Sequence, residues 1–152
     1  MTISPALRNI ALGLAAGLVG TLVMTLGQKV EMALDDRSPS NEPAEAAEKI
    51  GGFAVADERS EQLLSSGVHF AYGIGLGVGL AALDEVPEPT RTALYFVATQ
   101  ATGMAVIQVL DLQGKPSDWD APTAAIDVGH HLVYAIAAGL AYAGGKRLLV
   151  ER

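Results

Sequence analysis

Cysteine is absent from this 152-residue chain, so it has neither disulfide bonds nor thiolate ligands for a metal. Charged residues make up only 18% of it, below the roughly 25% of an ordinary soluble domain. The net charge of −7 argues against nucleic-acid binding, which depends on a basic surface. The sequence shows no Ser-His-Asp set and no phosphate-binding loop. We therefore expect a non-enzymatic protein without nucleic-acid partners.

Charge is missing altogether from four long stretches, residues 9–28, 62–83, 92–110 and 128–145. Each is close to the ~20 residues that cross a hydrocarbon core of ~30 Å. The outer face of a soluble helix would carry charges at every turn or so. The sequence therefore predicts an all-α integral membrane protein, with the lipid bilayer as its first partner.

The expected architecture is a single membrane domain over residues 1–152, folded as a four-helix bundle. The membrane spans are expected at about 10–27, 63–83, 92–110 and 124–144. A short surface helix is expected at about 43–50, because Pro43 suits a first helical turn and Gly51-Gly52 ends the pattern.

An internal repeat relates the two halves of the chain. His69-Phe-Ala-Tyr72 and His131-Leu-Val-Tyr134 begin similar apolar runs, with an Ile and a Gly at the same offsets after each. Each motif also follows a loop that contains Pro-Ser. The bundle is therefore predicted to consist of two tandem helical hairpins arranged in parallel, which places both histidines on one side of the membrane at similar depth.

Glycines recur at helical spacing within the apolar runs. Small residues four apart on a helix let a neighbouring helix approach closely. The alternating glycines of the second run lack the spacing and the strand–helix context of a nucleotide-binding turn. The positions expected at helix contacts are Gly13, Gly17, Gly73, Gly77 and Gly139.

Asp127 and His131 are four residues apart, so they share one face of a helix. A carboxylate beside a histidine raises its pKa and selects one tautomer. With His69 brought near by the repeat, these three residues are the candidates for a divalent-metal site or a proton relay. A haem held by the two histidines is a further alternative. Structural or proton-responsive polar packing is favoured, so no cofactor is predicted.

Orientation rests on the residues around the spans. Basic residues divide equally between the two sides, but Lys146-Arg147 directly follows the last span, where positive charge counts most. Most acidic residues lie in the loops on the opposite side. We therefore expect both termini in the cytoplasm, and the loops and the ends that carry His69 and His131 in the bacterial periplasm.

The spaced pattern of these residues resembles the YagU-like family of bacterial inner-membrane proteins. Three features carry the resemblance: Glu31 six residues before Arg37-Ser-Pro, His69 sixteen residues before Glu85, and Asp127 four residues before His131. It covers most of the chain, although this chain is shorter between Arg37 and His69 and has Asp127 where the family has Glu. The resemblance implies an inner-membrane location and no particular reaction.

Three functions follow as hypotheses. The leading one is a non-enzymatic inner-membrane protein whose periplasm-facing cluster responds to pH or binds a cation. The alternatives are a small transporter or channel subunit that acts as an oligomer, and an accessory subunit of a larger membrane complex. The cluster consists of Glu31, Arg37, His69, Asp127 and His131.

Overall fold

The computed structural model describes residues 4–112 and 116–150, and every regular element in these ranges is a helix. The α-helices are α1 (Pro5–Leu34), α2 (Glu42–Gly51), α3 (Glu58–Leu76), α4 (Val78–Ala82), α5 (Thr90–Leu110) and α6 (Ala121–Val150), and a 3-10 turn spans Pro116–Asp118. Four helical segments are long and apolar enough to cross a membrane: α1, α3 with α4, α5 and α6. The predicted all-α class with four membrane-length helices is confirmed.

Local chemistry accounts for several helix ends. Ser4 caps α1 by accepting a hydrogen bond from the Leu7 amide at 3.3 Å. Asp57 caps α3 in the same way, through the Ser60 amide at 3.0 Å. Gly52 ends α2 with φ at +66°, a conformation that a side chain would strain.

Two of the long helices extend beyond the predicted spans. α1 and α6 are each 30 residues long, because the helical backbone continues past the charge-free stretch into charged residues at one or both ends. The predicted second span is instead interrupted at Gly77, where α3 ends and α4 begins. The interruption lies where the chain touches α1: a Cβ added at Gly77 would meet the carbonyl oxygen of Gly13.

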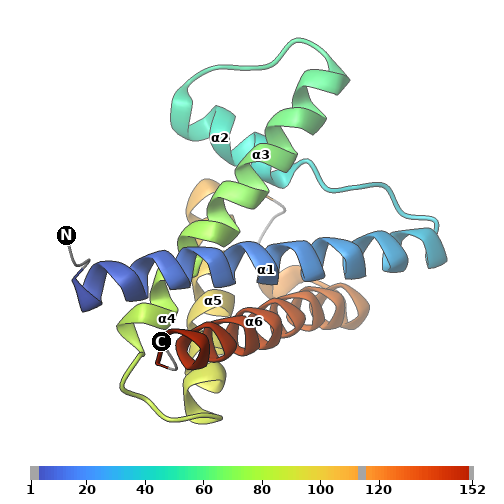
Figure 1. Cartoon of the computed structure of the whole chain (residues 1–152). Coiled ribbons are helices and arrows are strands. Elements are labelled where there is room, and N and C mark those ends of the chain that lie inside the picture. Colours follow the sequence, from blue (N-terminus) through green and yellow to red (C-terminus); the bar gives the residue numbers. More distant parts are fainter. Residues whose placement is uncertain (1–3, 113–115, 151–152) are drawn as a thin grey trace.

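The long helices differ in how they pack (Figure 1). α1 and α6 run side by side in opposite directions, with Gly20 against Tyr134 and Leu12 against Gly145. α3 crosses α1 obliquely, α5 packs against α6, and α2 rests on α3. The two halves are not packed equivalently, since α1 lies along α6 whereas the corresponding helices α3 and α5 make little contact with each other.

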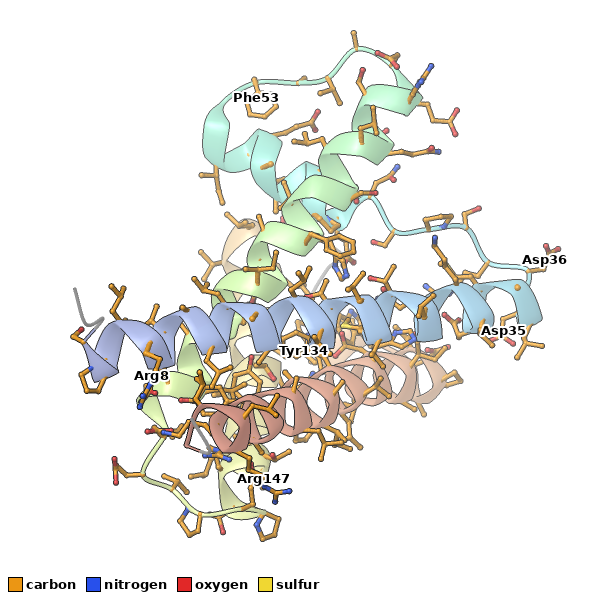
Figure 2. All side chains as sticks on the ribbon, in the orientation of Figure 1. Arg8, Asp35, Asp36, Phe53, Tyr134 and Arg147 are labelled. Atoms are coloured by element: carbon orange, nitrogen blue, oxygen red, sulfur yellow. The ribbon has the colours of Figure 1, made fainter. Side chains whose placement is uncertain are left out.

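The interior is built from small residues and tyrosines. Among the described residues, the central cluster consists of Ala16, Leu80, Tyr95, Tyr134, Ala135, Ala138 and Tyr142. Tyr134 lies between α1 and α6 (Figure 2). Many of the large aliphatic side chains of α1 and α6 point outward instead. A soluble bundle buries its aliphatic residues, whereas a lipid-facing one exposes them and packs through small residues.

Candidate functional site

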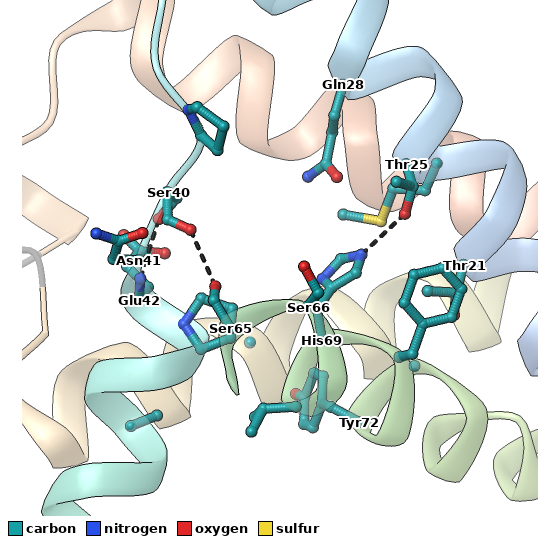
Figure 3. A pocket seen from close by; sticks show the side chains of 18 of the residues that line it. Thr21, Thr25, Gln28, Ser40, Asn41, Glu42, Ser65, Ser66, His69 and Tyr72 are labelled. Atoms are coloured by element: carbon teal, nitrogen blue, oxygen red, sulfur yellow. Dashed lines mark hydrogen bonds between the residues drawn. The ribbon is translucent and has the colours of Figure 1, made fainter. Parts of the chain in front are cut away.

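A cavity of about 890 Å³ lies on the side of the molecule where α2 packs against α3. Its lining comes from α1, α2, α3, α5, α6 and the segment between α1 and α2 (Figure 3). Most of the wall is apolar, with Met24, Leu76, Val106, Ile107 and Leu112 among the residues that form it. A volume of this size is in the range of small-molecule sites, which are mostly apolar with a few polar groups.

His69 and His131 both line this cavity. The Nε2 atom of His69, on α3, lies 3.2 Å from the hydroxyl of Thr25 on α1. The Nδ1 atom of His131, on α6, lies 2.9 Å from the carbonyl oxygen of Asp127, one turn earlier in the same helix. The two halves of the chain therefore contribute one histidine each to a single site, and each ring is held by a hydrogen bond.

Asp127, on α6 one turn before His131, links α6 to α5 through a side-chain hydrogen bond. Its Oδ2 atom accepts a hydrogen bond of 2.6 Å from the side-chain amide of Gln100, and its Oδ1 atom lies 3.5 Å from the Nδ1 atom of His131. The carboxylate is thus partly satisfied by a neutral donor. The expected proximity of Asp127 and His131 is present, and the histidine's shortest contact is to the backbone carbonyl.

Glu42 is a carboxylate of the same cavity that the sequence pattern did not single out. It occupies the first turn of α2, where its backbone amide donates to the Ser40 hydroxyl at 3.2 Å. Its Oε1 atom is buried and has no hydrogen-bond partner among the described residues. Burial, together with the negative charges of Asp127 and Glu45, raises the pKa of Glu42 to about 7. It therefore titrates near neutral pH.

Glu31 and Arg37 form a bidentate ion pair at the end of α1. The Nε and Nη2 atoms of Arg37 donate to the two carboxylate oxygens of Glu31 at 3.0 and 2.8 Å. His130 on α6 approaches the same carboxylate, with its Nε2 atom 4.0 Å away. Arg37 lines the cavity and Glu31 lies behind it. Of the five predicted cluster residues, four therefore line the cavity and the fifth holds one of those four in place.

The predicted packing glycines lie where helices touch. A Cβ added at Gly13 would be 2.5 Å from the carbonyl oxygen of Gly77, and one at Gly17 would be 2.7 Å from that of Gly73. A Cβ at Gly139 on α6 would meet the hydroxyl of Thr92 on α5. All of these contacts are within one chain.

The candidate metal ligands do not form a coordination group. Within residues 4–112 and 116–150, no three histidine or acidic side chains come together in an arrangement that could hold a metal ion. His69 and His131 line one cavity, but the hydrogen bond of each ring goes elsewhere, to Thr25 and to the Asp127 carbonyl. What the arrangement offers chemically is a mostly apolar chamber with a titratable polar end.

Sequence reasoning missed Glu42, Gln100 and Thr25. Gln100 and Thr25 lie within apolar spans, and only helix packing shows that they contact Asp127 and His69. Glu42 lies just before the predicted surface helix. The buried Ala44 and Ala46 show that this helix packs inward. The small apolar residues of that helix were the sequence signal that could have predicted its packing against the bundle.

Comparisons of this chain with protein-family models, curated proteins and solved structures found no match.

Proposed function

We propose that this chain is a non-enzymatic, multi-pass protein of the bacterial inner membrane that binds a small, largely apolar molecule in the cavity beneath α2. The observation that carries this proposal is the cavity itself, about 890 Å³ in volume and mostly apolar in its walls. Polar side chains from both halves of the chain also line it, but apolar atoms form most of the exposed wall. This composition is typical of a binding site for a small molecule.

The titratable end of the cavity supports a response to pH or to cations as part of this function. His69, His131, Asp127 and Glu42 all line it, and Arg37 closes it on the side of Glu31. Protonation of any of them changes the charge next to a bound molecule. This cluster is the feature that we propose as the sensing element.

The distribution of charge along α1 and α6 supports our proposal for the orientation of the chain in the membrane. Arg8 and Arg147 lie near one end of this pair, and Asp35 and Asp36 lie at the other (Figure 2). This separation supports cytoplasmic termini and a cavity that opens toward the periplasm. We also propose that the halves arose by duplication and diverged in packing, and that the chain is a member of the YagU-like family.

A transporter subunit is the second candidate function. The observation in its favour is that the cavity is walled by the same helices that are long enough to cross the membrane. The predicted packing glycines make contacts within the chain, so they do not support oligomer formation. Flux of a bound ligand into liposomes would separate transport from binding alone.

The binding proposal is tested with 1-dodecanol, a neutral alkyl probe, and the protein reconstituted in lipid nanodiscs. A ligand that binds only the folded state raises the unfolding temperature. We expect dodecanol to raise it for the wild type. Ser66→Trp, which fills the cavity, should abolish the shift.

The matched control is Gly67→Trp at the next position, which lies outside the cavity lining and has open space around it. This variant should retain the shift. An equal shift in all three proteins would mean that dodecanol acts through the bilayer, and it would overturn the proposal.

A further inference from the structure

Two buried side-chain acceptors at or beside the polar end of the cavity have no donor among the described residues. The Oε1 atom of Glu42 is buried without a partner among the described residues. The Oε1 atom of Gln100 is also buried without one; this side chain donates to Asp127 from behind the cavity wall and does not line the cavity itself. A buried acceptor without a donor costs about 1–3 kcal/mol. A ligand that donates a hydrogen bond to Glu42 would therefore remove this cost.

The charges around this end favour a cation. Arg37 is paired with Glu31 at 2.8 Å, and Lys49 is paired with Glu45 at 2.9 Å, so both of these cations are already engaged by other carboxylates. In the part of the chain that the structure describes, neither Glu42 nor Asp127 has a lysine or arginine nitrogen within 4.0 Å.

Other titratable groups face these two carboxylates. Lys29 lines the cavity from α1 and is exposed. Glu45, on the same helix as Glu42, and three histidines are the others: His131 beside Asp127, His130 next to it, and His69 on α3. Within the described residues, neither carboxylate forms a salt bridge with a lysine or arginine, and the charge of Arg37 offsets that of Glu42 only from a distance, so together they repel an anionic group and attract a positive one.

The apolar part of the cavity indicates the size and polarity of the rest of the ligand. Apolar atoms form most of the wall, and aliphatic and methionine side chains from α1, α3 and α5 contribute to it. A volume of about 890 Å³ is far larger than a bare metal ion requires, and no ligand group for a metal is present in the described residues. The space fits an alkyl or aromatic body attached to one polar group.

From these observations we infer that the cavity binds an amphiphilic organic cation, whose protonated amine donates to Glu42 and Asp127 and whose apolar body lies against α1, α3 and α5. This inference rests on the proposed binding function and adds the charge and the donor character of the ligand. It distinguishes an alkylamine from alcohols and carboxylates of the same length.

The experiment compares dodecylamine, 1-dodecanol and dodecanoate in nanodiscs of uncharged lipid at pH 8, where Glu42 is mostly ionised because its pKa is about 7. Affinity is obtained from the dependence of the unfolding temperature on ligand concentration. We expect dodecylamine to bind wild-type protein roughly tenfold more tightly than dodecanol, the effect of one charge-assisted hydrogen bond. Dodecanoate should bind most weakly.

Variants then assign the preference to the two carboxylates. Glu42→Gln and Asp127→Asn should each reduce the roughly tenfold preference for dodecylamine over dodecanol by roughly threefold, because the two carboxylates share the ammonium group, with the affinity for dodecanol unchanged. Glu58→Gln is the matched control, since it removes one negative charge from an exposed position outside the cavity. It should retain the preference.

The two proposals fail in different ways. If none of the three ligands shifts the unfolding temperature of the wild type, the binding function is wrong. If dodecanol or dodecanoate binds as tightly as dodecylamine, the binding function stands and the cationic ligand is wrong. If Glu58→Gln reduces the preference for dodecylamine as much as Glu42→Gln does, the preference arises from surface charge, and the inference is also wrong. The wild-type comparison decides the question even if a variant fails to fold.

Discussion

Asp84 connects three parts of the chain at the end of the molecule away from the cavity. Its Oδ2 atom accepts hydrogen bonds from Asn9 at 2.9 Å and from Lys146 at 2.7 Å, and its Oδ1 atom accepts one from Tyr142 at 3.0 Å. The guanidinium of Arg91 lies over the Tyr142 ring, 5.2 Å from its centroid. A single carboxylate thus joins α1 and α6 to the turn after α4.

Asp84→Asn should destabilise the fold by roughly 1–3 kcal/mol, because it removes a charge-assisted bond to Lys146 and leaves that ammonium unpaired. Thermal unfolding in nanodiscs measures the loss. Glu85→Gln is the control, since it neutralises the adjacent, exposed carboxylate. If both variants lose the same stability, Asp84 does not have the connecting role described here.

The same bonds determine how the Asp84 contribution depends on pH. Burial alone would raise the pKa of Asp84, but the hydrogen bonds from Lys146 and Tyr142 outweigh it and hold the pKa below its usual value. A lowered folded-state pKa stabilises the protein above the unfolded value of about 3.9, and this contribution is lost as the pH falls further. The difference between wild type and Asp84→Asn should therefore shrink below about pH 4.

Among the helices, the contact of α1 with α3 depends on the absence of side chains. Gly13 and Gly17 face Gly77 and Gly73 so closely that backbone atoms occupy the places of the missing Cβ atoms. Small residues allow such an approach, and van der Waals contact along it holds helices together in lipid. Gly27, on the same helix, has no atom within 4 Å of an added Cβ.

Gly17→Ala should destabilise the protein by about 1–3 kcal/mol, because the methyl group would collide with the backbone of α3. Gly27→Ala should be neutral or stabilise by up to about 1 kcal/mol, because alanine favours a helix and the position is open. Thermal unfolding of both variants in the same lipid provides the comparison. Equal effects would show that α1 and α3 do not pack through this face.

Across the whole molecule, the proposed pH response depends on groups that four separate parts of the chain bring together. Glu42 on α2 faces Asp127 on α6, Glu45 on its own helix, and Arg37 in the segment after α1. His69 and His131 line the same cavity from α3 and α6. A raised carboxyl pKa means that the folded state binds a proton more tightly than the unfolded chain does. Stability therefore falls as the pH rises from about 4.3 through 7 and then levels off.

Glu42→Gln should remove most of this slope between pH 5 and 7. The gain at pH 8 should be on the order of 1 kcal/mol, less than for a fully buried group because solvent screens part of the charge. Unfolding temperature against pH measures it, with Glu58→Gln as the control for an exposed carboxylate. An unchanged slope in Glu42→Gln would show that Glu42 does not contribute to the pH response.

The absence of charge was sufficient to predict the four membrane-length helices, and Pro43 with Gly51-Gly52 was sufficient to predict the short helix near residues 43–50, because these signals are local in the sequence. The interruption at Gly77 was not predictable in this way, since glycine is common in membrane helices and only the approach of Gly13 shows why the helix breaks there. The unequal packing of the two halves could not be predicted from the sequence either. Similar sequence motifs do not specify which of two equivalent faces a helix buries.

What the sequence by itself determined is the set of helices and the identity of the two histidines and the carboxylate Asp127 as chemically unusual residues in apolar surroundings. The tertiary structure alone decided that they share a cavity with Glu42 and Thr25, and that Arg37 is held by Glu31. The physical reason is that helix formation and membrane insertion depend on near neighbours in sequence, whereas a cavity depends on contacts between residues dozens of positions apart. The absence of charge from four stretches predicts the helices, and their packing assembles the site.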